Sequence, residues 1–184
     1  DIESVLAPKD AITGTEEAEG NQQGHREKVE HYLNHALEGN KELYSSIFVT
    51  DLNGSIAASA SLDNSEIEHA MKMINIDEIK ASQKQWISDA YLSMDDKTAF
   101  VLVGTPVVSE EGNMVGAVIQ VVNLNNLTTK IVSRSSDANY AYSIFNKDGI
   151  IISHENKDYV LKLDLSKENE SLEKLIGEMK VNKK

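Results

Sequence analysis

The order of hydrophobic and polar positions predicts one long helix near the start of the chain. From Gly24 to Leu43, apolar residues recur every three or four positions, and charged residues fill many of the positions between them. This spacing predicts an amphipathic helix that ends at Gly39 or soon after it. Residues 1–23 are polar and show little periodicity, so they predict a short helix and then an irregular stretch.

Two β-rich runs follow the helix and are joined by a tight turn. Ser46–Thr50 is β-branched and aromatic, Asn53-Gly54 is a typical turn pair, and Ser55–Ala60 returns as a second strand. Residues 64–84 have a less regular helical pattern, and residues 86–93 predict one further strand.

The next two strands carry the clearest indication of a binding function. Residues 99–108 and 114–124 are almost continuously apolar, and a polar turn at 109–113 joins them. A sheet with one face in water would alternate, so a continuous apolar run predicts that both faces are covered. The helix at 24–43 accounts for one face. A cover over the other face would leave a concavity suited to a small ligand.

A second hairpin, later in the chain, repeats the first. Residues 140–145 and 150–153 flank Asp148-Gly149, and placing Gly149 on Gly54 aligns the two strand–turn–strand segments. The repeat predicts two related modules in tandem. The chain stops after a predicted helix at 168–180, so we expect the second module to be incomplete. The predicted division is a helical region at 1–44, a first module at 45–135 and a partial second module at 136–184.

Composition and charge remove several classes of function. The 184 residues are 40% hydrophobic and 26% charged, which is typical of a globular protein, and the formal net charge is −12. Recognition of phosphate needs a basic face, so the charge argues against a nucleic-acid binder and against docking on an anionic membrane surface. The absence of cysteine excludes disulfides, thiolate zinc sites and cysteine nucleophiles.

The sequence contains no membrane or targeting signal of its own. No window of about 18 apolar residues is present, and the chain opens on Asp1-Ile2-Glu3 without a signal peptide. Taken alone, this pattern is typical of a soluble protein. It is equally compatible with a receptor domain whose membrane segments lie outside this sequence.

Several segments, in this order along the chain, together resemble the double-Cache sensor domain. The likeness spans roughly residues 25–165. The segments are Ile47–Gly54, Ile87–Ser93, Pro106–Val108 with Gly112, Gly116–Val118 leading to Leu124–Leu127, and Asn146–His154.

The resemblance implies an α+β fold in which a long N-terminal helix packs on a PAS-like antiparallel sheet, followed by an incomplete second Cache module. It implies the extracytoplasmic sensor domain of a bacterial membrane receptor, anchored by two flanking transmembrane helices that are not in this chain. Domains of this family bind small molecules, typically amino acids, amines or carboxylates. They serve methyl-accepting chemotaxis receptors, histidine kinases and diguanylate cyclases.

The sequence departs from the amino-acid-binding members of that family at the residues that hold the ligand. Those members have an Arg-x-Trp element after the first hairpin, whereas the corresponding Ser65–Ala70 contains no arginine. The aromatic residue of the third strand is present as Tyr91, but Ser93 and Val121 stand where aspartates are expected. A buried ammonium group without a carboxylate costs several kcal/mol. We therefore expect an uncharged or differently charged ligand, or an empty pocket.

The candidate ligand-binding residues follow from the resemblance and from strand alternation. Tyr91, Ser93 and Asp89 share one strand face by alternation. Trp86 has the opposite parity, which favours a core or rim position over a ligand platform. Thr105 and Val121 complete the predicted set.

No catalytic residue, metal or cofactor is predicted. His31 and His35 lie at i and i+4, but they lack the His-Glu-x-x-His pattern, and a solvated helix face explains them. Asp95-Asp96 and Glu110-Glu111 are paired acids that fall in predicted turns, where solvation explains them.

The sequence therefore predicts a non-enzymatic chemoreceptor domain that binds an unidentified small molecule and dimerises through the helix at 24–43. Two alternatives remain open. One is a ligand-free dimerisation or spacer module of a sensor histidine kinase or diguanylate cyclase. The other is a small hydrolase, for which the sequence offers no nucleophile motif.

Overall fold

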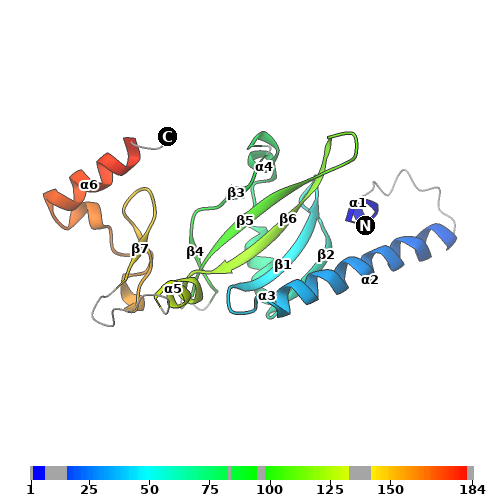
Figure 1. Ribbon diagram of the computed structural model, residues 1–184, viewed down its shortest axis with the longest axis horizontal. Helices are drawn as coiled ribbons and strands as arrows, with labels where there is room; N and C mark the ends of the chain where they lie inside the picture. Colours follow the sequence, from blue (N-terminus) through cyan, green and yellow to red (C-terminus); the bar gives the residue numbers. More distant parts are fainter. Residues whose placement is uncertain (1, 7–15, 83, 95–97, 133–141, 182–184) are drawn as a thin grey trace. The chain divides into compact units, whose positions relative to one another are not determined.

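The computed structural model describes residues 2–6, 16–82, 84–94, 98–132 and 142–181 (Figure 1). The chain divides into two compact units, Asp1–Asp89 with Leu102–Val122, and Ala90–Val101 with Asn123–Lys184. The division into helical region, first module and partial second module stays a prediction.

The elements follow the predicted α+β order. They are α1 (Ile2–Leu6), α2 (Glu16–Glu38), β1 (Tyr44–Asp51), β2 (Ile56–Ser61), α3 (Asn64–Met71), α4 (Ile76–Ser82), β3 (Trp86–Ile87), β4 (Tyr91–Leu92), β5 (Ala99–Val108), β6 (Met114–Asn123), α5 (Leu124–Val132), β7 (Ile144–Phe145), β8 (Ile151–Ser153), the 3₁₀ turns η2 (Lys157–Tyr159) and η3 (Leu165–Lys167), and α6 (Glu170–Val181).

The long helix ends where the sequence predicts and begins earlier. The Gly39 amide donates to the His35 carbonyl at 3.1 Å, and the helix stops at Glu38. Its predicted start at Gly24 is wrong, because α2 already begins at Glu16. The extra turns are rich in Glu, Gln and Ala, which favour helix without adding apolar periodicity.

The main sheet has the strand order β2-β1-β6-β5-β3, with β4 paired to β5. Strand β1 runs antiparallel to β2 and β6, and β5 runs antiparallel to β3 and β4. Strand β1 lies between β2 and β6, and Phe48 lies opposite Ser59 on β2 and opposite Ile119 on β6. Both predicted hairpins of this sheet are confirmed. Their turns contain Gly54 at φ 82° and Gly112 at φ 84°, a conformation in which a side chain is strained.

Helices α1 and α2 cover one face of the sheet in the first unit (Figure 1). Val29, Leu33 and Leu37 of α2 are buried at helical spacing against β1 and β2. With Leu6 of α1 they form a core cluster whose sheet members are Ile47, Val49, Ala58 and Ala60. The apolar stripe of the helix is therefore used for packing, as its periodicity predicts.

The opposite face of the sheet is also covered. Phe48 and Ile119 point away from α2 by strand alternation, and both are fully buried, as is Ile79 of α4. The burial predicted from the continuous apolar run is confirmed along β6, where no residue is exposed. It is wrong at the end of β5, where Thr105 and Val108 are exposed.

Two predicted elements are interrupted. The helix at 64–84 is two helices, and Asn75 caps the second one by accepting from the Glu78 amide at 3.2 Å. The strand at 86–93 is split into β3 and β4. The Ser88 amide still donates to the Leu102 carbonyl at 3.0 Å, but the Leu102 amide donates to the Ser88 hydroxyl at 2.9 Å, so a side chain replaces one backbone partner of this pair.

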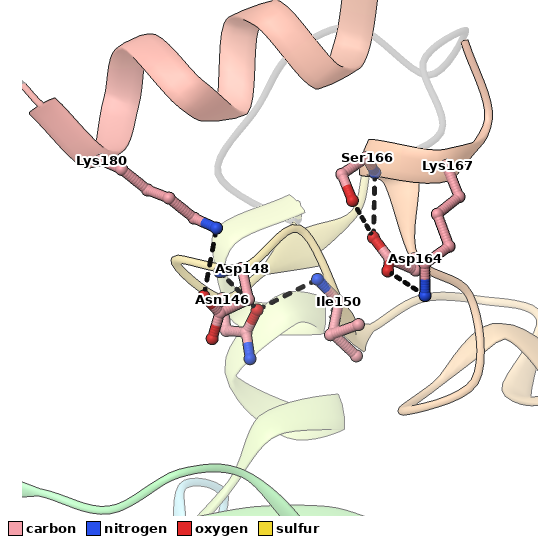
Figure 2. A network of polar contacts seen from close by, with 7 residues as sticks. All are labelled: Asn146, Asp148, Ile150, Asp164, Ser166, Lys167 and Lys180. Atoms are coloured by element: carbon pink, nitrogen blue, oxygen red, sulfur yellow. Dashed lines mark hydrogen bonds and ion pairs between the residues drawn. The ribbon is translucent and has the colours of Figure 1, made fainter.

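The second unit contains the predicted second hairpin and the predicted C-terminal helix (Figure 2). The Asn146 side chain accepts from the amides of Asp148 and Ile150, both at 3.0 Å, and fixes the turn. Gly149 in that turn has φ 90°. The Lys180 ammonium lies 3.3 Å from the Asp148 carboxylate and ties α6 to the hairpin.

Candidate functional site

The six predicted ligand-binding residues divide between the two units. Tyr91 and Ser93 belong to the second unit, and the other four, Trp86, Asp89, Thr105 and Val121, belong to the first. Each group is therefore described within its own unit, and a role in ligand binding stays a prediction for all six.

Tyr91 and Ser93 are both buried, with 7% and 6% of their surface exposed. The Tyr91 ring lies 5.9 Å from the Phe100 ring on the paired strand, at a tilt of 36°. Ser93 closes the strand pair, because its hydroxyl accepts from the Thr98 amide at 3.0 Å and its amide donates to the Thr98 carbonyl at 2.7 Å. The two side chains share an inward orientation, as their alternation predicts.

Trp86 occupies a half-buried position at the end strand β3. Its indole N–H donates to the Glu78 carboxylate at 2.7 Å, and it lies opposite Gly104 on β5. The hydrogen bond to Glu78 and the pairing with β5 both fix the position of the indole. The part that Trp86 plays in ligand binding, at a core or a rim position, stays a prediction.

The remaining three residues differ widely in exposure. Asp89 and Thr105 are exposed, whereas Val121 is fully buried. Asp89 lies in the break between β3 and β4, so the strand alternation that grouped it with Tyr91 does not apply.

One buried polar atom on the sheet was not found from the sequence. Thr50 is fully buried on β1, and among the described residues its hydroxyl has no hydrogen-bond partner. Strand alternation places it on the same face as Phe48, away from α2. On that face Ser46 is also fully buried, but its hydroxyl pairs with Ser61 at 2.7 Å. Thr50 therefore offers a hydrogen bond inside an otherwise apolar layer, and a lone threonine in a strand gives no signal of this.

A cavity of about 540 Å³ lies in the second unit and was also missed. Asparagines around the start of α5 and polar residues after β8 form much of its wall; these include Asn123, Asn125, Asn126, Ser153, His154 and Lys157. Such a site combines segments that are distant in sequence, so no single motif marks it. Its volume is in the range of small-molecule sites.

The described residues hold no group of three or more His, Asp or Glu placed to bind a metal ion. His31 and His35 are both exposed on α2, and the His31 ring makes an edge contact with Tyr32. None of the described helices is both long and apolar enough to cross a bilayer.

Comparison with known proteins gives a fold but no sequence family. No protein-family model and no curated protein sequence matches the chain. Solved structures do match, and one is an extracellular ligand-binding receptor from Desulfohalobium retbaense, with TM-score 0.62 and 13% identity over 95% of this chain. The chain has the fold of an extracellular sensor domain.

Two further structures share this fold. One is the extracellular domain of the histidine kinase mmHK1S-Z3, with TM-score 0.58 and 19% identity over 97% of this chain. The other is the ligand-binding domain of the Pseudomonas fluorescens chemoreceptor CtaA in complex with L-valine, with TM-score 0.52 and 18% identity over 75% of this chain. The chain spans 29%, 69% and 60% of the receptor, kinase and chemoreceptor chains, respectively. The double-Cache resemblance of the sequence is confirmed at the level of the fold.

Proposed function

We propose that this chain is the extracytoplasmic ligand-sensing part of a bacterial membrane receptor, and specifically of a chemoreceptor. The observation that carries the proposal is the fold, which is shared with extracellular domains whose ligands include L-valine. The chain itself would be held at the membrane by flanking helices outside this sequence. Its role is binding, and no catalytic residue is assigned.

The ligand site proposed for this function is the buried part of the sheet region. Tyr91 and Ser93 are the best-supported contacts, because both are buried polar side chains and their alternation on the strand holds. The sheet offers no arginine or aspartate at the positions expected for an amino acid, so the ligand would be uncharged or differently charged.

Signalling requires that the ligand distinguish two states of the domain. A ligand shifts such an equilibrium only by the difference between its affinities for the two states. The sheet and α2 are the natural pair of elements for this, because their packing forms the core of the first unit. A small change in that packing would be carried along a helix of 23 residues.

A spacer module that binds no ligand is the second candidate function. The dense packing of the sheet favours it, since Phe48, Leu102 and Ile119 on β1, β5 and β6 are each fully buried. A histidine kinase or diguanylate cyclase would use such a module to hold two subunits together.

A ligand screen separates the two functions. The 184-residue chain is tested by thermal shift and calorimetry against amino acids, carboxylates, purines and polyamines. The sensor proposal predicts at least one saturable hit, and Tyr91→Phe should weaken it by about tenfold because a buried polar partner is lost. Tyr32→Phe removes the same hydroxyl from an exposed helix position and should leave the affinity unchanged. A broad panel without a hit would favour the spacer.

A further inference from the structure

Two buried hydroxyl groups belong to the wall of the polar cavity in the second unit. The hydroxyls of Thr128 on α5 and Ser153 on β8 lie 2.5 Å apart, and both are within hydrogen-bond distance of the Leu124 carbonyl, at 2.9 and 3.2 Å. Thr128 and Ser153 are 8% and 1% exposed. These contacts join α5 to β8, so the cavity wall is a built part of the unit.

Asn125 provides an acceptor in this cavity that is unused within the described part of the chain. Its side-chain oxygen is buried and has no hydrogen-bond partner there. The neighbouring hydroxyl of Thr129 donates to the Asn125 backbone carbonyl at 3.0 Å and not to its side-chain oxygen. Buried acceptors are rarely left unpaired, because the lost hydrogen bond to water is not replaced. A ligand with an N–H or O–H group would satisfy this one.

The cavity wall also supplies donors. The Asn156 amide donates to Nδ1 of His154 at 2.8 Å, so the neutral imidazole carries its proton on Nε2. The side-chain amide of Asn126, which is exposed, adds both a donor and an acceptor. A ligand here therefore meets donors and acceptors together, which suits a hydroxyl group because it can act as either.

The charges at the cavity cancel. Lys157 and Glu155 both line it, both are exposed, and they carry opposite charges. Exposed charges are screened by solvent and contribute little on their own. The wall therefore provides no strong field that would select an anion or a cation.

We propose that this cavity is a second binding site, for a small uncharged molecule rich in hydroxyl groups, of the size of a monosaccharide. Neither Tyr91 nor Ser93 of the proposed sheet site is among the residues that line it. Thr98, which lines the cavity, is hydrogen-bonded to Ser93 of the proposed sheet site, so the two sites are distinguished by variants at Tyr91 and at Asn125, which they do not share. Failure of one does not imply failure of the other.

The test is an NMR titration of the 184-residue chain with glucose, galactose, ribose and myo-inositol, with lactate and succinate as charged comparators. At least one uncharged compound should shift the side-chain amide signals of Asn125 and Asn126 in a saturable manner. Asn125→Leu should weaken that binding by at least about tenfold, and Asn34→Leu, on the exposed face of α2, should not change it. Asn126→Leu, at an exposed position, is the second variant if Asn125→Leu unfolds.

Charge dependence distinguishes the proposed ligand class from an anion. Lys157→Gln should change the affinity for the uncharged compound by less than about twofold, and raising the salt from about 50 to about 500 mM should have as little effect. The proposal is overturned if none of the uncharged compounds shifts the Asn125 and Asn126 signals. It is equally overturned if only the anions bind and Lys157→Gln abolishes that binding.

Discussion

The indole of Trp86 lies directly opposite Gly104, and it fills the space that a side chain at position 104 would need. A Cβ atom at 104 would be 3.2 Å from the indole and 2.8 Å from the terminal methyl of Ile79. Because the methyl can shift, Gly104→Ala should lower the free energy of unfolding by about 1 to 2 kcal/mol, and Gly104→Val by more. Urea denaturation followed by Trp86 fluorescence measures both. Equal stability of Gly104→Val and the parent would contradict this packing.

Gly116 on β6 has less space for a side chain than Gly104 has. A Cβ atom there would lie 2.3 Å from the backbone carbonyl oxygen of Thr50 and 2.7 Å from the side chain of Leu6. Backbone of a central strand cannot move aside as a methyl can. We predict that Gly116→Ala destabilises the chain more than Gly104→Ala does, by about 3 kcal/mol. The reverse order in parallel denaturation curves would show that β1 and β6 are less closely apposed.

Substitution of a third glycine, Gly177, should stabilise the chain instead of destabilising it. Gly177 lies within α6, and among the described residues no atom outside its neighbours and the backbone of its own helix stands within 4 Å of the position that its Cβ would take. Gly177→Ala should therefore raise the free energy of unfolding by up to about 1 kcal/mol, because alanine loses less backbone entropy in a helix. Circular dichroism during thermal unfolding measures the gain. This variant is also the matched control for the two core glycines.

The fold was largely predictable because its strongest signals are local. Asn53-Gly54 and the apolar run of β6 each determine an element within a few residues, and both are present in the structure. Two of the errors arise where a polar side chain replaces a backbone partner. The hydroxyl of Ser88 accepts a hydrogen bond from a strand amide, and the side chain of Asn75 caps a new helix; neither residue type marks such a role by itself.

The candidate site was less predictable, because not all of its parts are close together in the sequence. Tyr91 and Ser93 are two residues apart on one strand, so alternation was enough to predict that both point inward. The cavity in the second unit needs Asn125 and His154 to come together, and they are far apart in the chain. Only the tertiary fold brings them to one wall.

The surroundings of the Asp164 carboxylate predict how the stability of the second unit depends on pH. The carboxylate accepts from the Ser166 hydroxyl at 2.6 Å and lies 2.9 Å from the Lys167 ammonium (Figure 2). The Ser166 hydrogen bond first, and Lys167 second, hold the pKa of Asp164 below its ordinary value of 3.8. A carboxyl whose pKa is lower in the folded state stabilises the fold above the unfolded pKa, and this contribution disappears as the pH falls through the folded pKa.

Asp164→Asn should therefore destabilise the second unit at pH 7 and leave its stability nearly unchanged well below pH 3.8. Urea denaturation at neutral and acidic pH measures the difference. Asp158→Asn, at an exposed position of the same unit, is the control and should show a smaller effect at neutral pH. A loss for Asp164→Asn that is the same at both pH values would exclude the carboxylate as the cause.

Substitution of Tyr32 would test the homodimer that the sequence predicts through α2. Tyr32 is 71% exposed on α2, and with Gly24, Glu27, Lys28 and His31 it lines a shallow hollow along one side of the helix. A large exposed aromatic side chain on a helix is suited to packing against the same helix of a second copy, since a two-fold interface is self-complementary. Tyr32→Glu should shift sedimentation equilibrium toward the monomer, because like charges would meet at the contact. Asn34→Glu adds the same charge to an exposed position outside the hollow and should leave the association unchanged. If both variants sediment as the parent chain does, the helix is not the dimer contact.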